Sequence, residues 1–294
     1  MPGAGSTALA ELDRIADRDG TVLSAWAGPT DGSTWLTRLP DAVHHAASTL
    51  KLPLAVAVLG AVETGRLDAD SPVLVRAEFS SVVGDRPYSL TAEYDNDDEP
   101  WERLGDSVPV RWLVERSLGR SSNLATNLLI DLVGVAAVAQ VYERCGADRS
   151  RLRRGIQDTV GAAGGQANTA TAADLCAVLA GLVNGRLLSR RSSDWLESVL
   201  ATNVWRDAIP AGLPAGTYVA DKPGWIDECC HDVAIVRPVG EPPFVLGVFT
   251  TTTLDEQAAH AVVAEAAGVV WRHRDELARE AAPQLAQQSA EFGG

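Results

Sequence analysis

The stretch STLKLPLAVAVLGAV, residues 48–62, places a serine and a lysine three positions apart at the start of an apolar run. The run is too short to span a bilayer and predicts a buried helix over 48–64. Residues three apart share a helix face, so Ser48 and Lys51 are expected to lie one turn apart. Partial burial at a helix N-terminus would lower the pKa of Lys51, and its neutral amine could then take a proton from Ser48. The alternative is a serine N-cap beside a solvated lysine.

The second and last lysine of the chain is Lys222, although the chain has 25 basic residues. It stands in Lys222-Pro223-Gly224 at the end of a predicted strand, where it could hold a substrate carboxylate or support a proton relay. Gly224 would let a substrate approach the backbone closely. An edge-strand lysine that discourages aggregation is the alternative. Between the two lysines, Ser121-Ser122-Asn123 opens a predicted helix, where a serine N-cap is also common.

In this order, the three elements resemble the Ser-x-x-Lys, Ser-Asp-Asn and Lys-Thr-Gly elements of the class A β-lactamase and penicillin-binding-protein superfamily. The similarity continues through residues 121–129, and residues 168–175 resemble the stretch that closes the family's Ω-loop. The resemblance implies a serine hydrolase with Ser48 as the acylated nucleophile and Lys51 as its general base. It also implies that Ser121 passes the proton to the leaving nitrogen.

The resemblance extends to the residues that would surround the substrate. It implies that Asn123 binds the substrate amide and that Lys222 acts on Ser121. It also implies that the oxyanion hole consists of the backbone N–H groups of Ser48 and Trp225, the residue after Gly224.

Departures from the family pattern concern substrate and turnover. Ser122 replaces an Asp, and Pro223 replaces a threonine whose hydroxyl helps to hold the β-lactam carboxylate in the family. The Ω-loop Glu that positions the deacylating water is missing, because residues 159–173 contain no acidic residue. Gln166 could hold a water without taking its proton, and Asp158 is the nearest acid that could replace the base.

These departures favour acylation at Ser48 by an amide, ester or β-lactam-like carbonyl, with weak or altered deacylation. Two alternatives stay open. A true class A β-lactamase would turn over β-lactam antibiotics rapidly. A non-catalytic binding protein on the same fold would bind its ligand equally well without Ser48 or Lys51.

The order of the predicted elements indicates an α+β fold. Strand signals occur at 21–27 and 33–39, which form a predicted hairpin, and again at 217–222, 232–237 and 244–252. Helical patterns occupy 6–18, 109–118, 122–133, 135–145, 171–183, 192–202 and 256–280, whereas 73–107 is expected to be irregular. We expect one β-lactamase-like domain over 1–294, with an antiparallel sheet built from both termini and flanked by the terminal helices. Its α/β part would cover about 1–50 and 210–285, and its all-α part about 51–209.

Composition excludes several classes of partner. A net charge of −14 argues against nucleic acid and against an anionic membrane surface. The expected partner is a small-molecule or peptide-like acyl substrate, and a monomer is the default expectation. The N-terminus has no basic and apolar leader, which predicts a cytoplasmic protein with reduced cysteines.

No cofactor is predicted, and the best candidate for a metal site fails on geometry. Glu228-Cys229-Cys230-His231-Asp232 contains metal-type ligands, but consecutive strand residues point to opposite faces. His231 could line the substrate pocket, although a buried structural histidine is the simpler interpretation.

Overall fold

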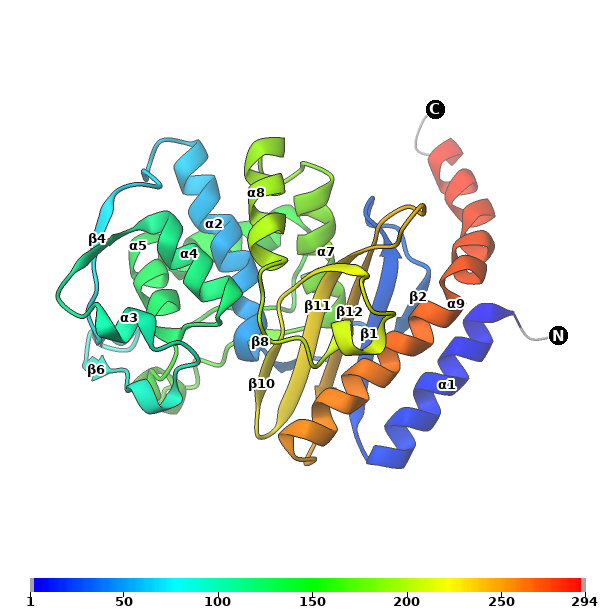
Figure 1. The fold of residues 1–294 in the computed structure, drawn as a ribbon, viewed down its shortest axis with the longest axis horizontal. Coiled ribbons are helices and arrows are strands. Elements are labelled where there is room, and N and C mark those ends of the chain that lie inside the picture. Colours follow the sequence, from blue (N-terminus) through cyan, green and yellow to red (C-terminus); the bar gives the residue numbers. More distant parts are fainter. Residues whose placement is uncertain (1–2, 292–294) are drawn as a thin grey trace.

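An antiparallel sheet joins the two ends of the chain in the computed structural model, which describes residues 3–291 (Figure 1). The strand order is β10–β11–β12–β1–β2, and β9 also pairs with β11. This arrangement confirms the predicted fold class and the N-terminal hairpin, in which Trp26 lies opposite Thr37. The strands are β1 (Val22–Pro29), β2 (Leu36–Arg38), β9 (Tyr218–Asp221), β10 (Gly224–Ile226), β11 (Cys229–Arg237) and β12 (Phe244–Thr251).

Helices cover both faces of this sheet. The terminal helices α1 (Ala4–Asp19) and α9 (Glu256–Glu291) lie side by side on one face, as Figure 1 shows in blue and orange-red. Helix α7 (Ala172–Val183) packs on the other face against β1 and β12. Successive residues of β11 therefore enter two different cores: Ala234 faces the terminal helices, whereas Val233 faces the helical part.

The middle of the chain forms the helical part beside the sheet. Its central helix α2 is buried over most of its length and contacts α5, which confirms the predicted buried helix. The 122–133 and 135–145 patterns lie in one element, α5, that is interrupted at Gly134 by a left-handed φ of 74°. The helices are α2 (Lys51–Glu63), α3 (Glu99–Glu102), α4 (Val110–Gly119), α5 (Asn123–Arg144), α6 (Thr159–Ala163) and α8 (Arg190–Leu200).

The segment expected to be irregular contains short paired strands. Within it, β4 pairs with β7 and β5 pairs with β6, and each strand is three residues long. Such short strands leave too few residues for a recognisable alternation, so the sequence pattern could not reveal them. The elements are β4 (Pro72–Leu74), β5 (Glu78–Ser80), β6 (Pro87–Ser89), β7 (Ser107–Pro109) and the turn η2 (Ala92–Tyr94).

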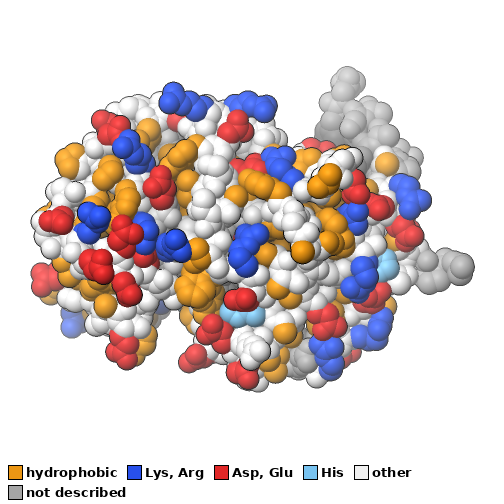
Figure 2. All heavy atoms as spheres, in the orientation of Figure 1, with side chains coloured by type: hydrophobic (Ala, Val, Ile, Leu, Met, Phe, Trp, Pro, Cys, Tyr) orange, Lys and Arg blue, Asp and Glu red, His pale blue; other side chains and the backbone are white. Residues whose placement is uncertain are grey.

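Helix α5 is the one described helix long and apolar enough, by length and composition, to cross a membrane. Its first turns are buried against α2 and α4, with Leu124, Leu128 and Leu129 in the core, so it packs as a core helix here. Figure 2 shows that the visible face carries Lys and Arg side chains interspersed with Asp and Glu over both halves of the molecule.

Candidate active site

Ser48 lies on a tight 3-10 turn, η1 (Ala47–Leu50), and α2 continues from it at Lys51. The predicted helix over 48–64 therefore begins with a different kind of turn, as is frequent at α-helix N-termini. Ala47 has a left-handed φ of 44°, which is strained for a residue with a side chain. Ser48 is half-buried, and its Oγ forms no hydrogen bond within the described part of the chain.

The backbone of β10 lies directly against this turn. A Cβ built on Gly224 would lie 2.5 Å from Ser48 N and 2.8 Å from Thr49 N. Only glycine fits at this distance, because the atoms that a side chain would meet belong to the backbone. Trp225 follows in the pocket wall, so the structure brings together the strand and the turn that the sequence assigns to the oxyanion hole.

Lys51 is fully buried at 0% exposure and points from α2 toward the start of α5. Its Nζ donates to the Ser121 carbonyl at 2.6 Å, to Ser121 Oγ at 3.1 Å and to Asn123 Oδ1 at 2.8 Å. Burial, followed by the charge of Lys222, holds the pKa of Lys51 well below its usual 10.5, against a smaller opposing effect of Asp95. This confirms that Lys51 is not a solvated surface lysine.

Ser121 lies between the two lysines. Lys222 Nζ donates to Ser121 Oγ at 3.2 Å and to the Pro223 carbonyl at 2.7 Å, so both amines reach the same hydroxyl. Ser121 has a left-handed φ of 60°, a strained conformation of the kind that clusters at functional sites. Burial lowers the pKa of Lys222 to about 8, although the carboxyls of Asp221 and Asp232 act in the opposite direction.

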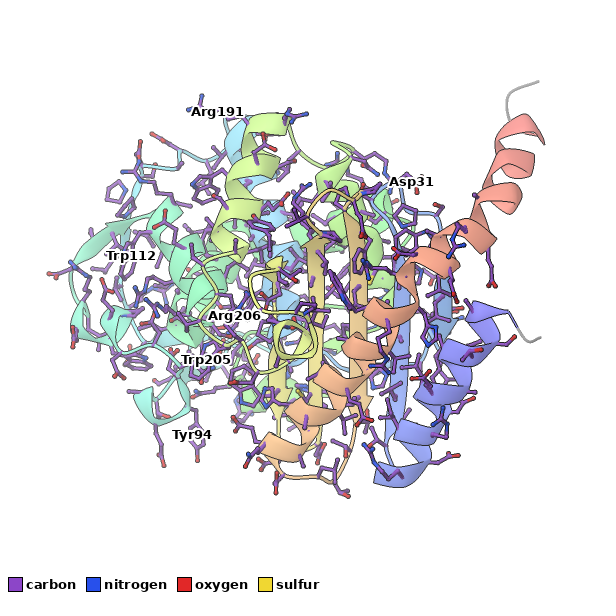
Figure 3. The ribbon with its side chains drawn as sticks, turned by 45° about the vertical axis from the view of Figure 1, so that its right-hand side comes forward. Asp31, Tyr94, Trp112, Arg191, Trp205 and Arg206 are labelled. Atoms are coloured by element: carbon purple, nitrogen blue, oxygen red, sulfur yellow. The ribbon has the colours of Figure 1, made fainter. Side chains whose placement is uncertain are left out.

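The amide of Asn123 joins Lys51 to the loop before α3. Its Oδ1 accepts from Lys51, and its Nδ2 donates to the Tyr94 carbonyl at 2.6 Å. Figure 3 shows Tyr94 projecting outward from this loop, in agreement with its 67% exposure.

Asp95 is a site residue that the sequence did not reveal. Its carboxylate accepts the backbone N–H groups of Asn123 and Leu124, both at 2.8 Å, and so caps the first turn of α5. A third bond comes from Trp101 Nε1 at 2.9 Å. Asp95 lies in the segment 73–107 that is expected from the sequence to be irregular, and a cap from 28 residues upstream has no local signature.

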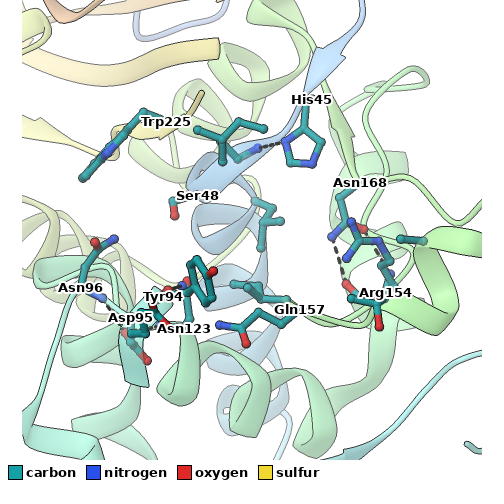
Figure 4. A pocket seen from close by; sticks show the side chains of 17 residues that line it. His45, Ser48, Tyr94, Asp95, Asn96, Asn123, Arg154, Gln157, Asn168 and Trp225 are labelled. Carbon is teal, nitrogen blue, oxygen red and sulfur yellow. Dashed lines mark hydrogen bonds between the residues drawn. The ribbon is translucent and has the colours of Figure 1, made fainter. Parts of the chain in front are cut away.

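A cavity of about 540 Å³ opens above Ser48 (Figure 4). Ser48 lies between Trp225 on one side and Asn123 with Tyr94 on the other, and Gln157, Arg154 and Asn168 form the remaining wall. Further lining residues are His45, Ala47, Leu50, Glu93, Asp95, Asn96, Ile156, Thr159, Ala162 and Ile226.

The wall formed by residues 154–168 contributes no carboxylate to this cavity. Asp158, the nearest acid, is fully buried and caps α6: it accepts from Gly161 N at 2.7 Å and from Ser81 Oγ at 2.9 Å. Gln166 is not among the residues that line the cavity, whereas Gln157 is. The sequence did not show which of these two glutamines faces the cavity. Gln157 lines the wall with a backbone in a left-handed conformation, at a φ of 59°.

His231 is buried beneath the turn that carries Ser48. Its Nε2 lies 2.7 Å from the His45 carbonyl and its Nδ1 accepts from Thr250 N at 3.1 Å, which defines a neutral ring. Burial lowers its pKa to about 3, and the ring stacks on Phe249. The structure therefore supports the structural interpretation of this histidine. Among the side chains that the structure describes, no group of three His, Cys, Asp or Glu residues has the arrangement of a metal site.

Comparison with known proteins gives a consistent result. The profile of a family described as "Beta-lactamase enzyme family" matches residues 7–274. A beta-lactamase of Streptomyces fradiae is 30% identical over 276 residues, which cover 90% of this chain and 86% of the relative. A beta-lactamase of Rhodobacter capsulatus is 27% identical over 229 residues, covering 76% of this chain and 72% of the relative.

Solved structures share the fold over nearly the whole chain. A beta lactamase from Xanthomonas campestris pv. campestris superposes with a TM-score of 0.80 at 26% identity, covering 92% of this chain and 98% of the other. The reconstructed ancestral class A beta-lactamase of Gram-negative bacteria gives a TM-score of 0.78 at 28% identity, over 90% and 99%. The structure titled PBP-A gives 0.74 at 22% identity, over 91% and 96%, and shows the shared fold alone.

Proposed function

The chain belongs to the beta-lactamase enzyme family and is a serine hydrolase of it, and on that premise we propose that Ser48 forms an acyl-enzyme that this protein hydrolyses slowly. The observation that carries the proposal is the position of the buried Ser121 Oγ, 3.1 Å from Lys51 Nζ and 3.2 Å from Lys222 Nζ. A hydroxyl that lies between two amines can relay a proton from one group to another. A serine with only a structural role would not need this position.

In the proposed acylation step, the neutral amine of Lys51 takes the Ser48 proton while Ser48 Oγ attacks the substrate carbonyl. The C–O bond to Ser48 forms and the bond to the leaving nitrogen or oxygen breaks. The proton returns from Lys51 through Ser121 to the leaving atom. The N–H groups of Ser48 and Trp225 would bind the oxyanion, and one such donor is typically worth ~3 kcal/mol of barrier.

The proposed slow deacylation rests on the wall formed by residues 154–168. Hydrolysis of the acyl-enzyme needs a base that takes a proton from water. Asp158 is engaged with Gly161 and Ser81, and the polar side chains that reach the cavity from this wall are amides, a hydroxyl and a guanidinium. These groups can hold a water molecule, but none is a ready base at neutral pH.

Time-resolved intact-mass analysis with a panel of β-lactams and activated esters tests this function. We expect covalent mass gain that is absent in Ser48→Ala and that decays over minutes or longer. Rapid decay with β-lactams, with many turnovers, would instead support the true β-lactamase that the named relatives favour. Absence of labelling, with ligand binding unchanged in Ser48→Ala, would support a non-catalytic binding protein.

A single substitution adds a carboxylate to the wall formed by residues 154–168. Gln157→Glu keeps the shape of a side chain in the cavity wall and replaces its amide by a carboxylate. A positioned general base typically contributes about 10²–10⁴-fold, so we expect the acyl-enzyme lifetime to shorten by at least ~10-fold. Gln166→Glu, from the same segment but outside the cavity lining, is the matched control. Equal lifetimes in both variants would show that a carboxylate at position 157 cannot activate the water.

The pH dependence of acylation follows from the two lysines. The acylation rate should rise with pH as Lys51 loses its proton. Because burial lowers the pKa of Lys51, this rise should occur well below pH 10.5. The rate should fall above about pH 8, where Lys222 loses the charge that it directs at Ser121. Lys222→Arg keeps a charge at all these pH values, so its rate should stay level where that of the wild type falls. An identical alkaline limb in both proteins, measured with a neutral ester, would assign that limb to another group.

A further inference from the structure

The charged groups around the Ser48 cavity bear on which substrates it accepts. Glu93 lines the cavity, is exposed and forms no hydrogen bond or ion pair with any side chain or backbone group that the structure describes. Asp95 also lines it, but its carboxylate is occupied by the N–H groups of Asn123 and Leu124. Arg154 is the one Arg or Lys among the lining residues.

Arg154 is already engaged by the protein. Its Nε donates to the Gln166 carbonyl at 2.9 Å and its Nη1 to the Gly155 carbonyl at 3.2 Å. Its own backbone is held by Asn168, whose Nδ2 donates to the Arg154 carbonyl at 3.0 Å. Two of the five guanidinium N–H donors therefore support the cavity wall. The positive charge of Arg154 shares this lining with the negative charges of Glu93 and Asp95.

The opposite rim carries a second carboxylate. Glu228 is exposed on the turn between β10 and β11, two residues after Ile226, which lines the cavity. Burial, followed by the charge of Arg154, lowers the pKa of His45 in the cavity lining, and the charge of Glu228 opposes them with a smaller effect. Glu93 and Glu228 thus belong to the two segments, the loop of Tyr94 and the end of β10, that face each other across Ser48.

The corner where Lys222 and Pro223 meet offers little to an anion. Lys222 is fully buried, and two of its three donors are used by Ser121 Oγ and by the Pro223 carbonyl. Pro223 has neither a backbone N–H nor a side-chain hydroxyl. A carboxylate brought to this corner would meet the Pro223 carbonyl oxygen and could gain at most the third N–H of Lys222 in exchange for its lost water, which is costly.

We propose that this site selects acyl substrates with a neutral or cationic group beside the scissile carbonyl and discriminates against a carboxylate there, with Glu93 and Glu228 as the specificity-determining side chains. The inference rests on the proposed function of Ser48. It predicts that common carboxylate-bearing β-lactams acylate this enzyme more slowly than uncharged activated esters of similar size.

Three 4-nitrophenyl esters of matched length test the proposal: the glutarate monoester (anionic), its methyl ester (neutral) and the 4-(trimethylammonio)butyrate (cationic). The second-order rate of Ser48 acylation is measured by intact mass at low and high salt. We expect the anionic ester to react about 10-fold more slowly than the neutral one at low salt, and the gap to narrow at high salt, since exposed charges are screened.

The double variant Glu93→Gln/Glu228→Gln should raise the rate of the anionic ester about 3- to 10-fold and leave the neutral ester unchanged. Glu102→Gln/Glu143→Gln removes the same charge from exposed glutamates outside the cavity lining and is the matched control. An equal gain in both double variants would assign the effect to net charge alone. Equal rates for the three esters would overturn the proposal and leave the proposed function intact, whereas no acylation by any ester would overturn the function itself.

Discussion

Replacing Lys51 with arginine or methionine is expected to lower the acylation rate of Ser48 by about 10²–10⁴-fold, the typical contribution of a positioned general base. Methionine removes the amine and keeps the length of the side chain. Arginine keeps a positive charge, but a guanidinium cannot give up its proton to become a base. Acylation should therefore be slow in both variants, although only the methionine variant lacks a side chain that can carry a positive charge.

The comparison between the two variants decides what Lys51 does. An arginine variant that keeps more than about a tenth of the wild-type rate would show that the site needs charge at this position and not a base. Thermal unfolding of each variant is the control, since Ser121 and Asn123 both lose a hydrogen-bond donor with the methionine. The rate with a neutral activated ester, followed by intact mass, is the measurement.

Replacing Gly224 with alanine is expected to reduce acylation by about 10²–10³-fold, the usual effect of removing one oxyanion-hole donor. The new Cβ would lie 2.5 Å from Ser48 N and 2.8 Å from Thr49 N, closer than unbonded atoms can approach. Because backbone atoms on both sides form the contact, β10 and the Ser48 turn must move apart. The N–H groups proposed to bind the oxyanion would then no longer converge.

Gly60→Ala is the matched control for this substitution. Gly60 lies on α2, where a Cβ would have one neighbour, Leu188 Cδ2, at 4.0 Å. Alanine in a helix interior is favoured over glycine by up to about 1 kcal/mol, so this variant should keep its activity and be as stable as the wild type or more so. A Gly224→Ala enzyme that acylates at the wild-type rate would show that the contact between β10 and Ser48 plays no part in catalysis.

The sequence predicted the parts of the site that depend on short-range order. Ser48 and Lys51 are separated by one turn, Ser122 caps its own helix by accepting from Ala125 N at 3.1 Å, and Gly224 precedes a pocket-lining residue. Each of these relationships is set within a few residues, where backbone geometry leaves few choices. The α+β fold class followed similarly from the order of the strand and helix patterns.

Tertiary structure alone decided the groups that meet from distant segments. Asp95 caps a helix that starts 28 residues later, Lys222 reaches Ser121 across 101 positions, and Gln157 rather than Gln166 faces the cavity. Burial of Lys51 was a condition in the sequence argument, and it is met because the residues around Ser121 and Asn123 pack against α2. The sequence thus determined which side chains could perform acyl transfer. Packing determined their pKa values and which charges surround the substrate, because both depend on what lies next to a group in space rather than along the chain.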